Sequence, residues 1–152
     1  MVYTFLLTDN FGDTMKTFLL TCFLGFFLSA CVTTHSSIYQ QLGGQSKVEE
    51  VVDNLITEIE FDPVMYGFFK DSSIPRFRKK IGEHICMLTG GPCEYTGDKM
   101  DQVHAGMNIS ESEFNHGVDL FIIAMTKAGI PHTVQNKILA VIVPTRDEMI
   151  YL

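Results

Sequence analysis

The stretch GGPCEYTGDKMDQVHAGMNIS runs from Gly90 to Ser110 and separates two segments that have apolar, helical periodicity. Four glycines and a proline make it typical of a loop. It nevertheless carries a histidine, His104, between Val103 and Met107. On these residues alone, an ordinary core or surface histidine is the favoured interpretation, and a metal ligand is the alternative.

The composition indicates one acidic domain. The chain has 152 residues, with 11 Lys and Arg against 18 Asp and Glu, and a formal net charge of −7. Binding to a nucleic-acid backbone requires clustered cations, so this charge argues against nucleic-acid partners. The one basic cluster, residues 76–80, is interpreted as a solvated helix face. Twelve Phe and no Trp predict a core of Phe and aliphatic side chains.

Residues 1–30 have the layout of a secretory signal. Lys16 precedes the apolar run TFLLTCFLGFFLSAC, which ends in small residues. The run is shorter than the roughly 20 residues that a bilayer-spanning helix needs. A buried helix or a membrane anchor is the alternative. Met15 is a more natural start than Met1, so residues 1–14 are interpreted as an over-extended start.

The end of this run, Leu28-Ser29-Ala30-Cys31, resembles the lipobox of bacterial lipoproteins. The resemblance implies cleavage before Cys31, lipidation of that residue, and a tether over residues 31–37. Val32 stands where a retention signal would have Asp, which implies the periplasmic side of a Gram-negative outer membrane. Membrane contact would then be through the lipid anchor only.

Two cysteines, Cys86 and Cys93, remain as thiols in the part of the chain that is expected to fold. In an oxidising compartment such a pair is a candidate for a disulfide. The bridge and two free thiols both stay open as alternatives, with free thiols favoured.

The remaining chain has the apolar periodicity of helices and no strand-like alternation. Ser110 and Glu113 form a capping box at the start of one helix, and Asp62-Pro63 is typical of the start of another. The predicted fold is all-α. The apolar stripes indicate a short first turn at 38–42, a short helix through 68–69, and four main helices around 48–59, 74–88, 114–125 and 134–142.

Four motifs, SIYQQLGG, FDPVMYGFF, GGPCEYTGDKMDQVHAGMNISESEF and AGIPHTVQNKILAVIVP, resemble those of group I truncated haemoglobins. The resemblance covers residues 37–144 and implies a two-on-two helical sandwich around haem b, here assigned to residues 38–150. It also places His104 at the family's proximal iron-ligand position, which reverses the preference for an ordinary histidine. Globins hold iron through one axial imidazole. His35, His116 and His132 do not match that position.

The resemblance also locates the distal side of the haem pocket. Ile56 stands where the family usually has Tyr, and Ile81 stands where it usually has Gln, with Phe77 at a further distal position. The hydrogen-bonding cage for a bound gas is therefore expected to be missing, and the distal pocket to be apolar.

Three further residues are candidates for the haem pocket. Lys80 is expected to contact a haem propionate, and ligation of the iron is the alternative. His84 is expected either to reach the gas ligand or to pack flat against porphyrin or a helix. In the extreme case His84 would itself be a sixth iron ligand. Tyr95 is a second candidate for a propionate contact.

The leading functional hypothesis is therefore a haem protein that reversibly binds oxygen, nitric oxide or carbon monoxide. One alternative is a haem enzyme for nitric oxide dioxygenation or peroxide chemistry, which requires a reductase. Another is a six-coordinate haem for electron transfer or redox sensing.

Overall fold

The computed structural model describes residues 36–152, and the regular elements in this part of the chain are all helices. One isolated parallel bridge joins Ile109 and Ile150. The prediction of an all-α fold is confirmed. Residues 1–35 lie outside the described residues, together with the predicted signal, Cys31 and His35.

The helices follow one another with short connections, except for the segment that carries the glycine-rich stretch. They are α2 (Ile38–Leu42), α3 (Gly44–Phe61), α4 (Tyr66–Phe69), α5 (Ile74–Leu88), α6 (Met100–Val103), α7 (Glu111–Lys127), α8 (His132–Ile142) and the 3-10 helix η2 (Val143–Glu148).

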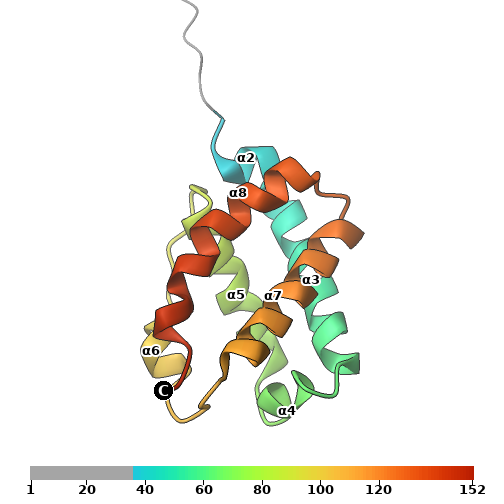
Figure 1. The fold of residues 1–152 in the computed structure, drawn as a ribbon. Coiled ribbons are helices and arrows are strands. Elements are labelled where there is room, and N and C mark those ends of the chain that lie inside the picture. The colour runs from blue at the N-terminus through green and yellow to red at the C-terminus, as the bar shows by residue number, and fades with distance from the viewer. Residues whose placement is uncertain (1–35) are drawn as a thin grey trace, which may run out of the picture. The chain divides into compact units, whose positions relative to one another are not determined.

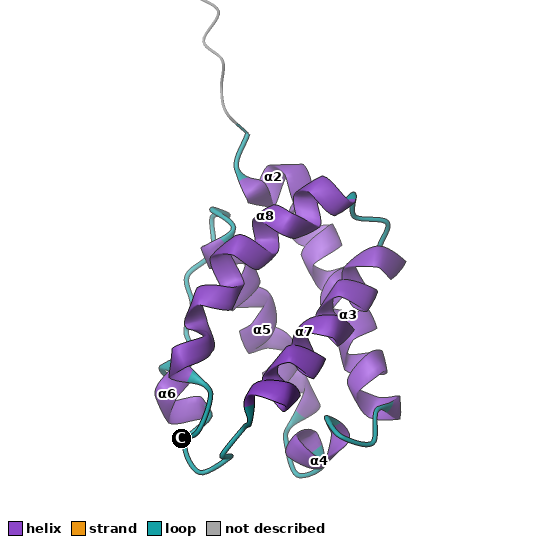
Figure 2. Ribbon diagram, in the orientation of Figure 1, coloured by secondary structure: helices purple, strands orange, loops and turns teal. Residues whose placement is uncertain are grey.

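The four long helices form two pairs. In the view of Figure 1, α7 and α8 lie in front of α3 and α5. Helix α3 contacts both α5 and α7, so it is the central element of the packing. The same view coloured by secondary structure shows a long loop between α5 and α6 along one side (Figure 2).

The core is built on the apolar stripe of α3. Its fully or nearly buried side chains are Val48, Val51, Val52, Leu55 and Ile59. They pack in one cluster with side chains of α5, α7 and α8, namely Ile85, Leu120, Phe121, Ala124, Met125, Val134 and Ile138. Three polar contacts join α3 to α7 and its C-cap: Asn54 donates to the carbonyl of Ala124 at 3.2 Å, Lys47 donates to that of Ala128 at 2.8 Å, and Lys127 pairs with Glu58.

The helix boundaries follow from local chemistry. Ser110 caps α7, its hydroxyl accepting from the Glu113 amide while the Glu113 carboxylate accepts from the Ser110 amide, which confirms the predicted capping box. Gly43 ends α2 with a φ of 113°, a conformation that favours glycine. The short helix predicted after Asp62-Pro63 begins later than expected, at Tyr66, because a turn occupies residues 63–65.

Among residues 36–152, none of the helices has both the length and the apolar character needed to cross a bilayer.

Candidate haem site

An apolar cavity of about 240 Å³ lies between α3, α5, α7 and α8 and is closed on one side by the segment around α6. Its walls are almost entirely aliphatic, aromatic and methionine side chains. Five polar or charged residues line it: Lys80, His84, Tyr95, His104 and Glu113. Glu113 already serves the capping box of α7, so the other four are the groups able to meet a ligand.

His104 follows α6 directly and is partly buried at the cavity. Its Nδ1 lies 2.8 Å from the carbonyl oxygen of Met100, one turn earlier in the chain. A carbonyl can only accept, so this contact requires the proton on Nδ1, and in the neutral imidazole Nε2 is then the acceptor. Metal-binding histidines are typically oriented by such a contact on the other ring nitrogen. The one-turn helix α6 was not predicted from the sequence.

The predicted distal residues do not all line the cavity. Phe77 and Ile81, on α5, do. Ile56 does not: its side chain lines a neighbouring pocket. On α3 the cavity is lined by Leu55 and Ile59 instead, which the sequence reasoning missed. Leu55 and Ile59 therefore join Phe77 and Ile81 in the cavity wall, and the distal role of Ile56, whose pocket adjoins the cavity at Ile59, Phe69 and Phe77, stays a prediction.

Lys80 is held at the edge of the cavity by two partners. Its Nζ donates to Glu83 Oε2 at 3.1 Å and also to the hydroxyl of Thr96. The same Glu83 oxygen accepts from the Thr96 amide at 3.1 Å and hydroxyl at 2.8 Å. These bonds, those from Thr96 foremost, lower the pKa of Glu83 to about 2. Glu83 and Thr96 were not singled out from the sequence.

His84 and Tyr95 lie side by side, with their ring centroids 5.0 Å apart and their planes tilted by 46°. Burial lowers the pKa of His84 and raises that of Tyr95. Tyr95 Oη donates to the carbonyl of Asp98 at 2.9 Å. Both residues line the cavity and also a second, adjoining pocket that contains Glu148, so they stand at its rim.

The turn before α4 is fixed by one carboxylate. Asp62 Oδ1 accepts from the amides of Val64 and Met65 at 3.0 and 2.8 Å, and Oδ2 lies 2.7 Å from His116 Nε2. Met65 lines the cavity, so this arrangement positions one of its walls from α7. His132 begins α8 and does not line the cavity.

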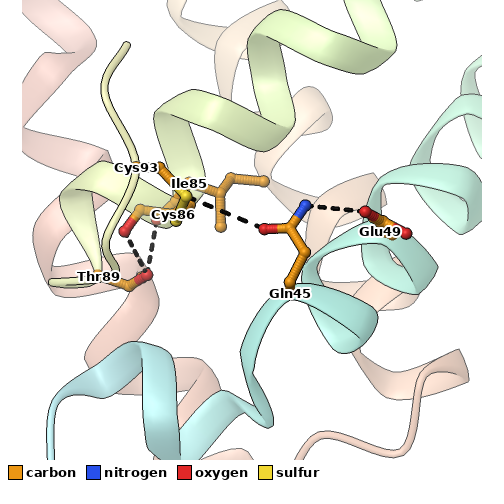
Figure 3. The surroundings of a disulfide bond; sticks show 6 residues. All are labelled: Gln45, Glu49, Ile85, Cys86, Thr89 and Cys93. Carbon is orange, nitrogen blue, oxygen red and sulfur yellow. Dashed lines mark hydrogen bonds between the residues drawn. A yellow bond between two sulfur atoms is a disulfide. The ribbon is translucent and has the colours of Figure 1, made fainter.

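A disulfide joins Cys86 and Cys93 (Figure 3). The favoured expectation of free thiols is therefore wrong. Cys86 is fully buried at the end of α5, and the bridge ties that helix to the segment that carries Tyr95 and Thr96. The Cys93 sulfur also lies 3.9 Å from Gln45 Oε1. This is a contact and not a hydrogen bond, because a bridged sulfur carries no proton.

Known proteins are similar to this chain in sequence. Residues 37–151 match the model of the bacterial-like globin family. The chain belongs to this family. A group 1 truncated hemoglobin from Mycolicibacterium paratuberculosis is 34% identical over 114 residues, which are 75% of this chain and 84% of that protein. The corresponding protein of Tetrahymena pyriformis is 28% identical over 114 residues, covering 75% of this chain and 94% of its own.

Solved structures of truncated hemoglobins have a similar fold. The truncated hemoglobin of Tetrahymena pyriformis in its Fe(III) form superposes with a TM-score of 0.74 at 27% identity, covering 77% of this chain and 100% of that one. The predicted truncated-globin fold and the group I assignment are thus confirmed.

The cofactor of this globin is haem iron, and the residues present fit it. The cavity wall is apolar, as a porphyrin requires, and the imidazole of His104, held through Nδ1, lines it. Lys80 and Tyr95 lie toward the edge, where polar groups suit the propionates. Among the described residues, no group of three or more His, Cys, Asp or Glu side chains forms a metal site of another type.

Proposed function

We propose that the chain is a gas-binding truncated haemoglobin in which His104 Nε2 supplies the axial ligand of the haem iron. The observation that carries the proposal is the 2.8 Å contact between His104 Nδ1 and the Met100 carbonyl. It selects the tautomer with a free Nε2 and fixes the orientation of the ring. Haem held by His104 would supply an iron atom that is able to bind a diatomic gas.

The distal wall supports reversible binding rather than tight retention. Phe77, Ile81 and Leu55 present hydrocarbon, and none of them can donate a hydrogen bond to a gas molecule. These side chains exclude water from the pocket and leave the gas without a polar contact from the distal wall. We therefore expect rapid release of oxygen. Nitric oxide and carbon monoxide are the other candidate ligands.

The contacts of Lys80 favour a propionate partner over an iron ligand. Ligation requires a neutral amine, whereas Lys80 is paired with the carboxylate of Glu83. For His84, the neighbouring Tyr95 ring favours packing at the rim of the cavity. We infer a sixth position open to gas, and the six-coordinate haem stays the alternative. The enzymatic alternative and its reductase partner stay predictions.

The test is a haem titration of the purified full chain. We expect stoichiometric binding, a high-spin ferric spectrum, and a ferrous form that takes up carbon monoxide and oxygen reversibly. A low-spin ferric spectrum would instead support an internal sixth ligand. Absence of stoichiometric haem binding would refute the proposal.

We also propose that the globin is anchored to the outer membrane, on the periplasmic side, through a lipid on Cys31. The support is the sequence Leu28-Ser29-Ala30-Cys31 and, independently, the Cys86–Cys93 bridge, since disulfides persist mainly in oxidising compartments. Mass spectrometry of the cell-derived protein should find residues 1–30 absent and Cys31 acylated, and Cys31→Ser should abolish both changes. An unmodified Cys31 in an intact chain would refute the proposal.

A further inference from the structure

The segment that follows His104 is held by the last residues of the chain. The amides of Gly106 and Asn108 both donate to the same main-chain oxygen of Leu152, at 3.2 and 3.0 Å. In the opposite direction, the Tyr151 amide donates to the carbonyl of Ile109 at 3.0 Å. We call residues 150–152 the C-terminal clip.

The backbone is unusual on both sides of this contact. Asn108 and Tyr151 have φ values of 46° and 56°, and they are the only non-glycine residues with positive φ within residues 36–152. Side chains disfavour this conformation, so it persists only where the surroundings impose it. Both strained residues lie in the clip and its partner segment, which indicates that this contact is imposed by the fold.

The clip lies beside the haem cavity. Ile109, which pairs with Ile150, lines the cavity and is 8% exposed. Met149 lines it from the clip side, and Met107 lines it from the segment after His104. Loss of the clip would therefore free a wall of the cavity together with the segment attached to His104.

We propose that the C-terminal clip positions His104. The Met100 carbonyl holds the imidazole from the preceding turn. The clip holds the backbone of residues 106–109 from the other side, so the ring is restrained in both chain directions. This inference rests on the proposed role of His104 as the iron ligand.

Two substitutions of Tyr151 separate the backbone contact from the side chain. Tyr151→Pro removes the amide proton and excludes positive φ, so it opens the clip. Tyr151→Gly removes the same side chain, including its hydroxyl near the Glu111 amide, but keeps the amide and tolerates positive φ. The two variants therefore differ in whether the amide of residue 151 can donate to the Ile109 carbonyl, which is the contact that they test.

The readouts are the rate of haem transfer to an excess of apoglobin and the iron–histidine stretching band of the ferrous protein by resonance Raman. We expect Tyr151→Pro to lose haem about two- to tenfold faster, as for one lost hydrogen bond, and to broaden or shift the band. Tyr151→Gly should match the wild type in both. If the two variants lost haem at the same rate, slow or fast, and gave the same iron–histidine band, the proposal would be overturned.

Hydrogen exchange of the wild-type, haem-loaded chain provides a check that needs no variant to fold. The Gly106 and Asn108 amides should be protected, and rapid exchange of both would overturn the proposal. A wild type without an iron–histidine band would refute the role of His104 instead, whereas the exchange measurement would still report on the clip.

Discussion

His104 and Met100 are joined across one turn, with the imidazole Nδ1 2.8 Å from the carbonyl oxygen. The acceptor is a backbone atom, so the contact depends on the path of the chain through α6 and not on the identity of the Met100 side chain. The first prediction is that the side chain at position 100 does not orient the imidazole ring. Met100→Leu, a nearly volume-conserving change, should keep the iron–histidine band of the wild type. A shifted band in resonance Raman spectra would mean that the side chain orients the ring.

The apolar distal wall can be tested at Ile81, which lines the cavity. Ile81→Gln adds a donor, whereas Ile81→Met is similar in length and adds none. One hydrogen bond to the gas contributes about 0.5–1.5 kcal/mol, so the Gln variant should release oxygen about two- to tenfold more slowly than the Met variant. Stopped-flow measurement of the rate of oxygen release from the two variants tests this prediction. Equal rates would mean that a missing donor at this position is not the cause of rapid release.

The ion pair between Lys80 and Glu83 predicts the behaviour of the sixth position. Because Glu83 and Thr96 hold the Lys80 amine, Lys80→Ala should leave the ferric absorption spectrum high-spin, as in the wild type. Lys80→Arg, which cannot ligate iron at any accessible pH, is the matched control. A low-spin wild type that becomes high-spin in both variants would show that Lys80 binds the iron.

The disulfide should stabilise the fold by restricting the unfolded chain. A loop of this length, between Cys86 and Cys93, corresponds to about 2–3 kcal/mol in the chain-entropy model. Cys93→Ser should lower the free energy of unfolding by about this amount in urea titrations, since Cys93 is only half-buried. Added reductant should lower the wild type to the same level and leave the variant unchanged. A wild type indifferent to reductant would contradict the prediction.

Asp62 predicts a pH dependence of stability. Its pKa is lowered, chiefly by the hydrogen bond from the Met65 amide and further by His116. A lowered carboxyl pKa adds stability above the unfolded value of about 3.9 that is lost as pH falls below it. Asp62→Asn keeps an acceptor for the Met65 amide but loses the charge. The unfolding free energies of wild type and variant should differ at about pH 7, and the difference should shrink as pH falls below the unfolded value of about 3.9. A constant difference would contradict the charge effect.

The sequence was sufficient for the helices, because their apolar stripes and the capping box at Ser110 are local signals. It was not sufficient for the distal wall. Leu55 and Ile56 are adjacent and both apolar, so periodicity could not show that Leu55 lines the cavity while Ile56 lines the adjoining pocket.

Two other features depend on the fold rather than on local sequence. The single turn of α6 is too short for an apolar period to appear. The disulfide forms because the chain reverses after α5, where a Cβ on Gly91 would lie 2.5 Å from the Cys86 sulfur. Only glycine permits that close approach, and a spacing of seven residues does not reveal it.

The most direct test of the central claim is the ferrous iron–histidine band of His104→Gly, recorded without and with added imidazole. If His104 is the axial ligand, the variant should lose the band together with tight haem binding. Imidazole should enter the space left by the side chain and restore both. A variant that keeps the wild-type band and haem affinity without imidazole would show that another residue holds the iron.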